Sequence, residues 1–332
     1  MINQMPQLVK YSRILENGKW IDPTAEETIS MALREDRLAW AHLNGKHPDA
    51  AEWVSAELDY LDLQAREALL DVDTRPRIKV VQDGVILILR GINYNDGEDP
   101  EDMVSIRIYV DEHRIVTVAR KRIMAIERIE AAMDAGHGPL SAGDFLVILI
   151  EDLVGHIAEF QAELDAIAED LELKVVSEKG RELRHDVAAL RLQVIAARRY
   201  VGPQRDALRS FADTTVSFMD PETRREIEEE AQKMTRIAED MDELRDQAVV
   251  LREELSGQLS DQVNKNTFVL SVLSAIFLPL GFITGLFGVN VGGMPGVESP
   301  IAFWLLSILC AGLFAFPLLG LWIFRLMNRK AR

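Results

Sequence analysis

Cysteine is nearly absent from this 332-residue chain, and histidine is scarce. The single cysteine, Cys310, excludes an intrachain disulfide. The six histidines are scattered between residues 42 and 185, and no two have the His-x3-His spacing of a metal-binding pair. The chain also lacks a Gly-rich phosphate loop with Lys-Ser/Thr, a His-Glu-x-x-His motif and a Cys-x-x-Cys pair. We therefore expect neither an enzyme nor a resident cofactor, and the sequence assigns no metal ligand.

Acidic and basic side chains are almost missing from residues 267–324, where Glu298 is the only one. Two apolar runs, 267–289 and 301–324, each have about the 20 residues that a helix needs to cross a bilayer. They predict two transmembrane helices joined by a periplasmic loop at 290–300. The rest of the chain is acidic, with a formal net charge of −17 overall, and an acidic surface repels nucleic acid. We expect the lipid bilayer as a partner and no nucleic acid.

Positive charge is absent from the loop 290–300 but follows the second run, in the tail 325–332, at Arg325, Arg329, Lys330 and Arg332. The positive-inside rule places this basic tail in the cytoplasm. Two spans return the chain to the same side, so the N-terminal part is predicted to be cytoplasmic as well. Trp304 and Trp322 near the two ends of the second run fit interfacial anchors.

Residues 1–220 predict an α+β cytoplasmic domain that ends in a long helical hairpin. The strand-like runs are 38–43, 78–81, 85–89, 105–110 and 114–118. Turn signals at 82–84 and 111–113 favour two antiparallel hairpins. Helices are predicted around 49–70 and 121–134, with a loop at 93–102. Ser141 is expected to cap a helix that reaches about Val176, and a second helix reaches about Ser210, bent or interrupted by Pro203.

A third helix is predicted to begin at Asp220-Pro221, with Asp at the cap and Pro at the first helical position. Apolar residues then recur every three or four positions from Ile227 to Leu259. Gly257 is the only candidate breaker, and one glycine costs about 1 kcal/mol without ending a helix. We therefore expect one helix over 221–288, about 100 Å long, of which residues 221–266 form a cytoplasmic stalk.

Small and polar residues form a stripe at helical spacing along the first apolar run. Its members are Asn264, Thr267, Ser271, Ser274, Leu278, Gly281 and Gly285. Two interpretations stay open, because Gly281-x-x-x-Gly285 is a helix-packing motif and polar side chains in a membrane also line water. Two spans cannot enclose a channel, so a pore needs several copies around an axis. Leu278 would then form an apolar constriction, and Pro279 is expected to kink the helix locally.

Three features of the hairpin, Leu278-Pro279-Leu280, Gly285-x-x-Gly288 and Asn290, closely resemble the CorA superfamily of divalent-cation transporters. The resemblance implies a cytoplasmic α/β domain, a stalk helix, two spans and a funnel-shaped homopentamer with the first span lining the pore. It also implies an outer-mouth cation site at Gly288, Val289 and Asn290. An Asn290 ring would hold a hydrated cation by its water shell, and Asn264 would form a second polar ring at the cytoplasmic end.

Val289 stands where magnesium-type members usually carry Met, and the loop continues as Gly-Gly-x-Pro-Gly. This pattern resembles the ZntB branch, the bacterial zinc transporters of the superfamily. The resemblance implies an inner-membrane protein that transports Zn²⁺, with proton-linked uptake favoured. A magnesium/cobalt channel and zinc efflux remain alternatives, as do Ni²⁺ and Cd²⁺ as cargo. Zinc rests on resemblance alone, because zinc prefers His and Cys ligands and the stripe has neither.

A membrane-anchored signalling or scaffold protein with an oligomeric stalk is the competing class. It predicts no ion flux and tolerance of bulky apolar residues along the stripe. A scaffold has no need of the Gly288-Val289-Asn290 terminus, which favours the transporter.

Overall fold

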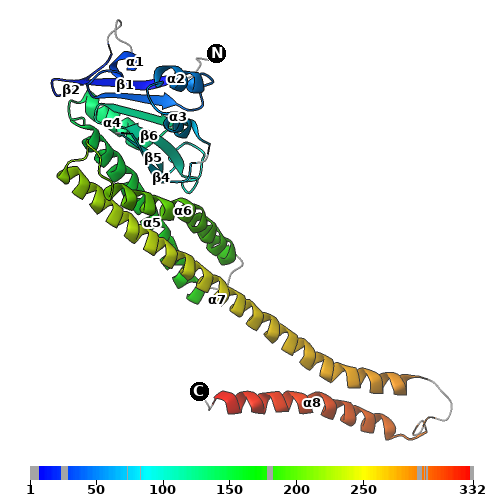
Figure 1. The fold of residues 1–332 in the computed structure, drawn as a ribbon. Coiled ribbons are helices and arrows are strands. Elements are labelled where there is room, and N and C mark those ends of the chain that lie inside the picture. Colours follow the sequence, from blue (N-terminus) through cyan, green and yellow to red (C-terminus); the bar gives the residue numbers. More distant parts are fainter. Residues whose placement is uncertain are drawn as a thin grey trace. The chain divides into compact units, whose positions relative to one another are not determined.

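The computed structural model describes residues 7–23, 29–72, 74–82, 84–177, 182–289, 294, 296 and 298–329. The chain divides into two compact units, Met1–Arg252 and Glu253–Arg332. We call the first the sheet unit and the second the two-helix unit (Figure 1). The architecture is α+β with a long helix, as the sequence predicts.

The sheet unit is built on a seven-stranded mixed sheet of order β2-β1-β3-β7-β6-β5-β4. β3 and β7 pair in parallel, and the other neighbouring strands are antiparallel. The five predicted strands are confirmed as β3 (Ala39–Asn44), β4 (Arg77–Val81), β5 (Gly84–Gly91), β6 (Val104–Val110) and β7 (Arg114–Ala119). The two predicted hairpins are the β4–β5 and β6–β7 pairs. Two further strands, β1 (Val9–Glu16) and β2 (Lys19–Ile21), are not predicted from the sequence.

Helices cover both faces of this sheet. α2 (Ala50–Glu57) and α3 (Leu63–Leu70) pack on one face, where Val54, Leu58 and Leu69 join the strand residues of the core. On the other face Trp40 of β3 contacts Phe145, with ring centroids 5.3 Å apart. β3 is buried along its whole length because both of its faces are covered. Two further helices, α1 (Ile29–Ala32) and α4 (Met124–Asp134), complete the α+β part.

Three long helices follow, α5 (Ala142–Ser177), α6 (Glu182–Ala212) and α7 (Pro221–Gly288). Ser141 caps α5, its Oγ accepting from the Asp144 backbone N–H at 3.0 Å. Asp220 caps α7 in the same way, its Oδ1 accepting from the Thr223 N–H at 2.7 Å. Both predicted starts are therefore confirmed, and so is the single helix over 221–288.

Pro203 is predicted to bend or interrupt α6. The interruption is wrong, because α6 runs through Pro203 as one helix, and the bend stays a prediction. Proline removes one backbone hydrogen bond, but packing on both sides can hold the helix together. Val201, Gln204 and Leu208 are all fully buried around this position. α7 likewise continues through Pro279 to Gly288, and α8 (Ala302–Arg329) follows.

Gln204 of α6 takes the place of a strand partner for β5. β4 stops pairing where Arg77 lies opposite Ile88, so the backbone of Arg90 lies beyond the end of β4. The Gln204 Oε1 accepts from the Arg90 N–H at 2.6 Å, and its Nε2 donates to the Arg90 carbonyl at 3.0 Å. Gln204 is completely buried. One side-chain amide thus bonds both the N–H and the carbonyl of Arg90.

Gln204→Leu should destabilise the protein by about 1–3 kcal/mol, because it removes both hydrogen bonds between the buried Gln204 amide and the Arg90 backbone. Unfolding of the purified chain by heat or denaturant measures this loss. Gln232→Leu, on an exposed position of α7, is the matched control and should change stability little. Equal stability of the two variants would mean that the Gln204 amide is not needed at the end of β4.

Candidate functional site

The predicted stripe lies on α7, and every one of its seven members is exposed. The bulky member, Leu278, exposes 74% of its surface. Gly281 and Gly285 have open space around them, since a side-chain carbon built on either would meet no heavy atom within 4 Å. The Gly-x-x-x-Gly motif therefore makes no close helix contact within the described part of the chain.

The stripe faces away from α8. Within the two-helix unit the end of α7 and α8 lie side by side (Figure 1). The least exposed positions of α7 recur every three or four residues, at Val272, Ile276, Leu280 and Ile283, and Ile276 exposes only 3%. Two residues along a helix turn a side chain by about 200°. Ser274 and Leu278 therefore lie on the side of α7 opposite Ile276.

Hydroxyl groups in this unit fall into two classes. Thr284 donates to the Leu280 carbonyl and Ser307 to the Phe303 carbonyl, each at 2.8 Å. Such bonds to the preceding turn satisfy a hydroxyl within its own helix. The stripe hydroxyls of Thr267, Ser271 and Ser274 make no hydrogen bond to any described residue. Since unsatisfied polar groups are costly in lipid, the stripe is suited to face water or another copy of the chain.

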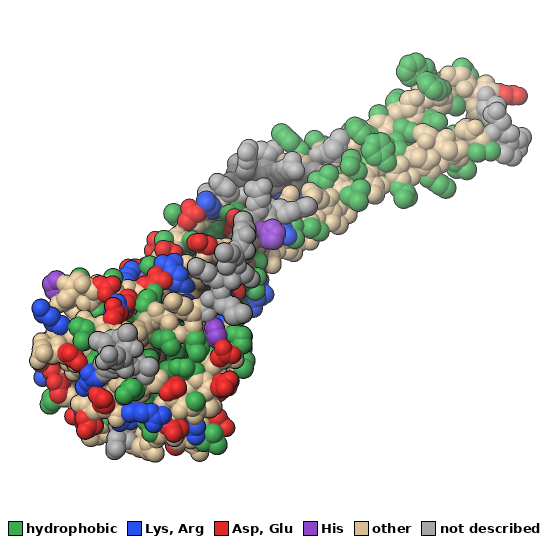
Figure 2. All heavy atoms as spheres, turned by 90° about the horizontal axis from the view of Figure 1, so that it is seen from above, with side chains coloured by type: hydrophobic (Ala, Val, Ile, Leu, Met, Phe, Trp, Pro, Cys, Tyr) green, Lys and Arg blue, Asp and Glu red, His purple; other side chains and the backbone are tan. Residues whose placement is uncertain are grey.

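The rest of this surface is apolar. α7 is long and apolar enough to cross a membrane, with a mean hydropathy of 2.2 over its most apolar 18 residues, of which 6% are buried. Figure 2 shows hydrophobic side chains spread over the surface of the two-helix unit. α8 carries a further apolar stretch at Ala302–Pro317. Exposed apolar area on this scale marks a membrane or protein contact.

The predicted outer mouth is described only in part. Gly288 is the last residue of α7, and Val289 beside it is exposed. Asn290 lies outside the described residues, as do much of the loop 290–300 and the end of the basic tail. The site at Gly288, Val289 and Asn290 therefore stays a prediction.

Metal-ligating side chains do not gather in the described part of the chain, where no three His, Cys, Asp or Glu residues form a cluster. His42 illustrates the role of a histidine in the core. It is buried on β3, its Nδ1 lies 2.9 Å from the Thr117 Oγ1, and burial lowers its pKa to about 3. It is therefore neutral at physiological pH.

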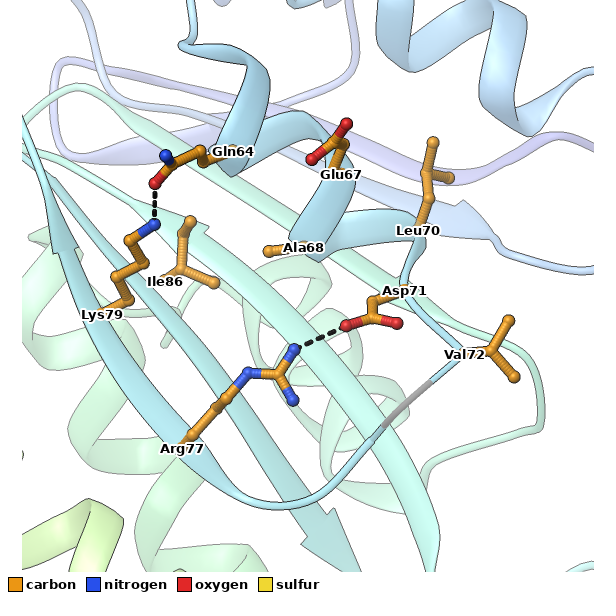
Figure 3. A pocket seen from close by; sticks show the side chains of 9 residues that line it. All are labelled: Gln64, Glu67, Ala68, Leu70, Asp71, Val72, Arg77, Lys79 and Ile86. Carbon is orange, nitrogen blue, oxygen red and sulfur yellow. Dashed lines mark hydrogen bonds and ion pairs between the residues drawn. The ribbon is translucent and has the colours of Figure 1, made fainter.

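A pocket of about 790 Å³ lies between α3, β4 and β5 (Figure 3). Glu67 lines the pocket. Both of the pocket's basic side chains have partners, since Arg77 pairs with Asp71 at 2.7 Å and Lys79 donates to the neutral Gln64. These partners leave the pocket without an obvious reactive group. Elsewhere in the sheet unit Arg90, Arg107 and Arg120 line a single pocket. This cluster is not predicted from the sequence, because its members are separated along the chain and come together only through strand pairing.

Comparison with known proteins gives the family. The family described as "CorA-like Mg2+ transporter protein" matches residues 35–325. The zinc transport protein ZntB of Yersinia enterocolitica is 32% identical over 293 residues, which cover 88% of each chain. The full-length CmaX protein has a similar structure, with a TM-score of 0.79, 27% identity and coverage of 97% of this chain and 98% of CmaX.

The CorA magnesium transporter from Methanocaldococcus jannaschii shares the fold, with a TM-score of 0.77 over 98% of each chain at 17% identity. The family match, the identity over most of the length and these folds agree with one another. This chain is a member of the CorA-like Mg2+ transporter family.

Proposed function

We propose that this chain is a zinc transporter of the bacterial inner membrane, working as a homopentamer whose pore is lined by the stripe on α7. Membership of the family makes it a divalent-cation transporter and not an enzyme. The cargo, the pore and the assembly are the proposed part. In this arrangement α7 and α8 both span the bilayer, and both chain ends lie in the cytoplasm.

One observation carries the proposal: the stripe lies opposite the face that α7 turns toward the α8 side. Its open glycines and unsatisfied hydroxyls have no described partner within the chain. A ring of five copies gives each stripe a common axis, where small residues allow close approach and hydroxyls meet water. Leu278 then forms the apolar constriction of that axis.

Zinc is favoured by the relatives, among them the ZntB proteins of Yersinia enterocolitica and Pectobacterium atrosepticum, at 32% and 33% identity. The stripe offers hydroxyl, amide and backbone oxygens but no His or Cys, so the ion would pass with its water shell. Asn290 at the outer end and Asn264 at the inner end are the proposed amide rings. The alternatives are a magnesium/cobalt channel, which the family's description favours, and zinc efflux.

Uptake is proposed to be linked to protons, although the stripe has no titratable side chain. The proton would then move through Glu298, the sheet unit or water. This requirement separates proton-linked uptake from a passive channel and makes coupling the first property to measure.

Purified protein in liposomes should take up Zn²⁺ faster than Mg²⁺, and an inward proton gradient should increase the Zn²⁺ rate. Ion-sensitive dyes report both ions, and protein-free liposomes give the background. Mg²⁺ flux that ignores the proton gradient would instead support the magnesium/cobalt channel. Absence of any cation flux would contradict a transporter and favour the scaffold.

Gly281→Leu should reduce flux by more than about tenfold or prevent assembly, because a bulky apolar side chain near the axis narrows and dewets the pore. Gly312→Leu is the matched control, since Gly312 is an equally open helical glycine on α8. Flux is measured in liposomes and assembly by light scattering. Normal flux and assembly of the α7 variant would place the stripe away from the axis.

Asn290→Ala should abolish flux while leaving the oligomer intact, because it removes the proposed outer ring of amide oxygens. Ser299→Ala, an exposed change in the same loop, should keep normal flux. An Asn290→Ala protein with wild-type zinc uptake would exclude Asn290 from the outer cation site.

A further inference from the structure

A strongly basic pocket of about 330 Å³ lies at one end of the sheet, beside the end of β5, the start of β6 and the end of β7. Among the described residues, its charged lining consists of one acidic side chain, Asp102, and five basic ones, Lys46, Arg90, Arg107, Arg120 and Lys121. This excess of positive charge is unexpected in a chain with a formal net charge of −17.

Arg107 of β6 is the buried member of this group, with 2% of its surface exposed. Its Nε and Nη2 donate to the Asp71 carbonyl at 3.1 and 2.9 Å. Its Nη1 is buried and has no hydrogen-bond partner among the described residues. Burial, together with Arg120 and Arg90, lowers the pKa of Arg107 to about 10, so the guanidinium remains charged at neutral pH. A buried charged N–H without an acceptor is costly and would be satisfied by an anion.

The neighbouring basic side chains differ in how many hydrogen bonds and ion pairs they already make. Arg90 donates to Thr74 and to the Met103 carbonyl and lies 4.0 Å above the Tyr200 ring. Lys121 pairs with Glu98. Lys46 and Arg120 are exposed and make no ion pair with any described residue. The Asp71 carboxylate also acts on Arg107, but it already pairs with Arg77. Among the described lining residues Asp102 is the one acidic side chain, so positive charge remains in excess at Arg107, Arg120 and Lys46.

We infer that this pocket binds a phosphate group, either as free orthophosphate or as part of a small phosphorylated molecule. Arginine suits this ligand because its planar N–H groups match phosphate oxygens in pairs. A second pocket of about 510 Å³ shares Thr74, Arg90 and Tyr200 with the first. It has room for the remainder of a larger ligand, such as a nucleotide. This pocket lies within the sheet unit, so its ligand does not depend on which cation the chain transports.

Calorimetric titration of the purified full-length chain tests it, with orthophosphate and ATP as separate ligands in metal-free buffer so that no divalent ion bridges them. We expect one ligand per chain. Arg120→Gln and Lys46→Gln should each weaken binding by about tenfold, the loss expected for one charge-assisted hydrogen bond. Orthophosphate that displaces ATP would identify the phosphate group as the feature recognised. Tighter binding of ATP than of orthophosphate would indicate that the second pocket also contributes to binding.

Arg236→Gln is the matched control, because it removes the same charge from an exposed position of α7 that does not line the pocket. It should bind like the wild type. Arg107→Met should also abolish binding, but the two exposed variants decide the test if that buried change impairs folding. Absence of binding for both ligands, or equal weakening by Arg236→Gln and Arg120→Gln, would overturn the inference.

Discussion

The continuity of helix α7 is the constraint on which the rest of this molecule depends. From Pro221 to Gly288 the helix is continuous although Pro279 removes one backbone hydrogen bond, and no loop intervenes between the part in the sheet unit and the part in the two-helix unit. The two parts of α7 differ in how many of their apolar side chains are buried. Ile227, Met234, Met241 and Leu251 are buried in the sheet unit, whereas only 6% of the residues in the most apolar 18-residue stretch of α7 are buried. A helix with such a change of environment needs two solvents, water with protein at one end and lipid at the other.

The polar side chains of the two-helix unit differ in whether their hydrogen bonds are satisfied within their own helix. Thr284 and Ser307 close their hydrogen bonds within their own helices, which makes them tolerable in lipid. The stripe residues do not, and they lie away from the Ile276 side of α7. A single chain offers them no partner among its described residues. The polar stripe is therefore an argument for association as much as for conduction, because both require another copy of α7.

Local signals in the sequence were sufficient to predict where the long helices begin, because Ser141 and Asp220 act through bonds to residues three positions away. They failed where distant packing decides. β1 mixes Lys10, Ser12 and Arg13 with apolar residues and was missed, since only Ile14 of this strand is buried. Proline favours a bend or an interruption of a helix, but α6 continues through Pro203, which has buried neighbours on both sides. The amide of Gln204 and the cluster around Arg107 depend on contacts between remote segments, which no periodicity reports. The stripe could be read from spacing alone, but its orientation relative to Ile276 required the structure.

The two candidate sites place opposite demands on an acidic chain. Cations are attracted by the net charge of −17 before they reach any pore, so the protein's surface raises their local concentration without specific ligands. The same net negative charge repels an anion that approaches the protein. Screening confines this repulsion to about 8 Å at physiological ionic strength, so an anion site must act through close contacts. Arg107 meets this condition, because burial strengthens its interaction with a ligand in contact. The exposed Arg120 and Lys46 extend the positive region to the surface. With Arg107 buried and Arg120 and Lys46 exposed, the basic pocket can attract an anion at short range although the protein as a whole is acidic.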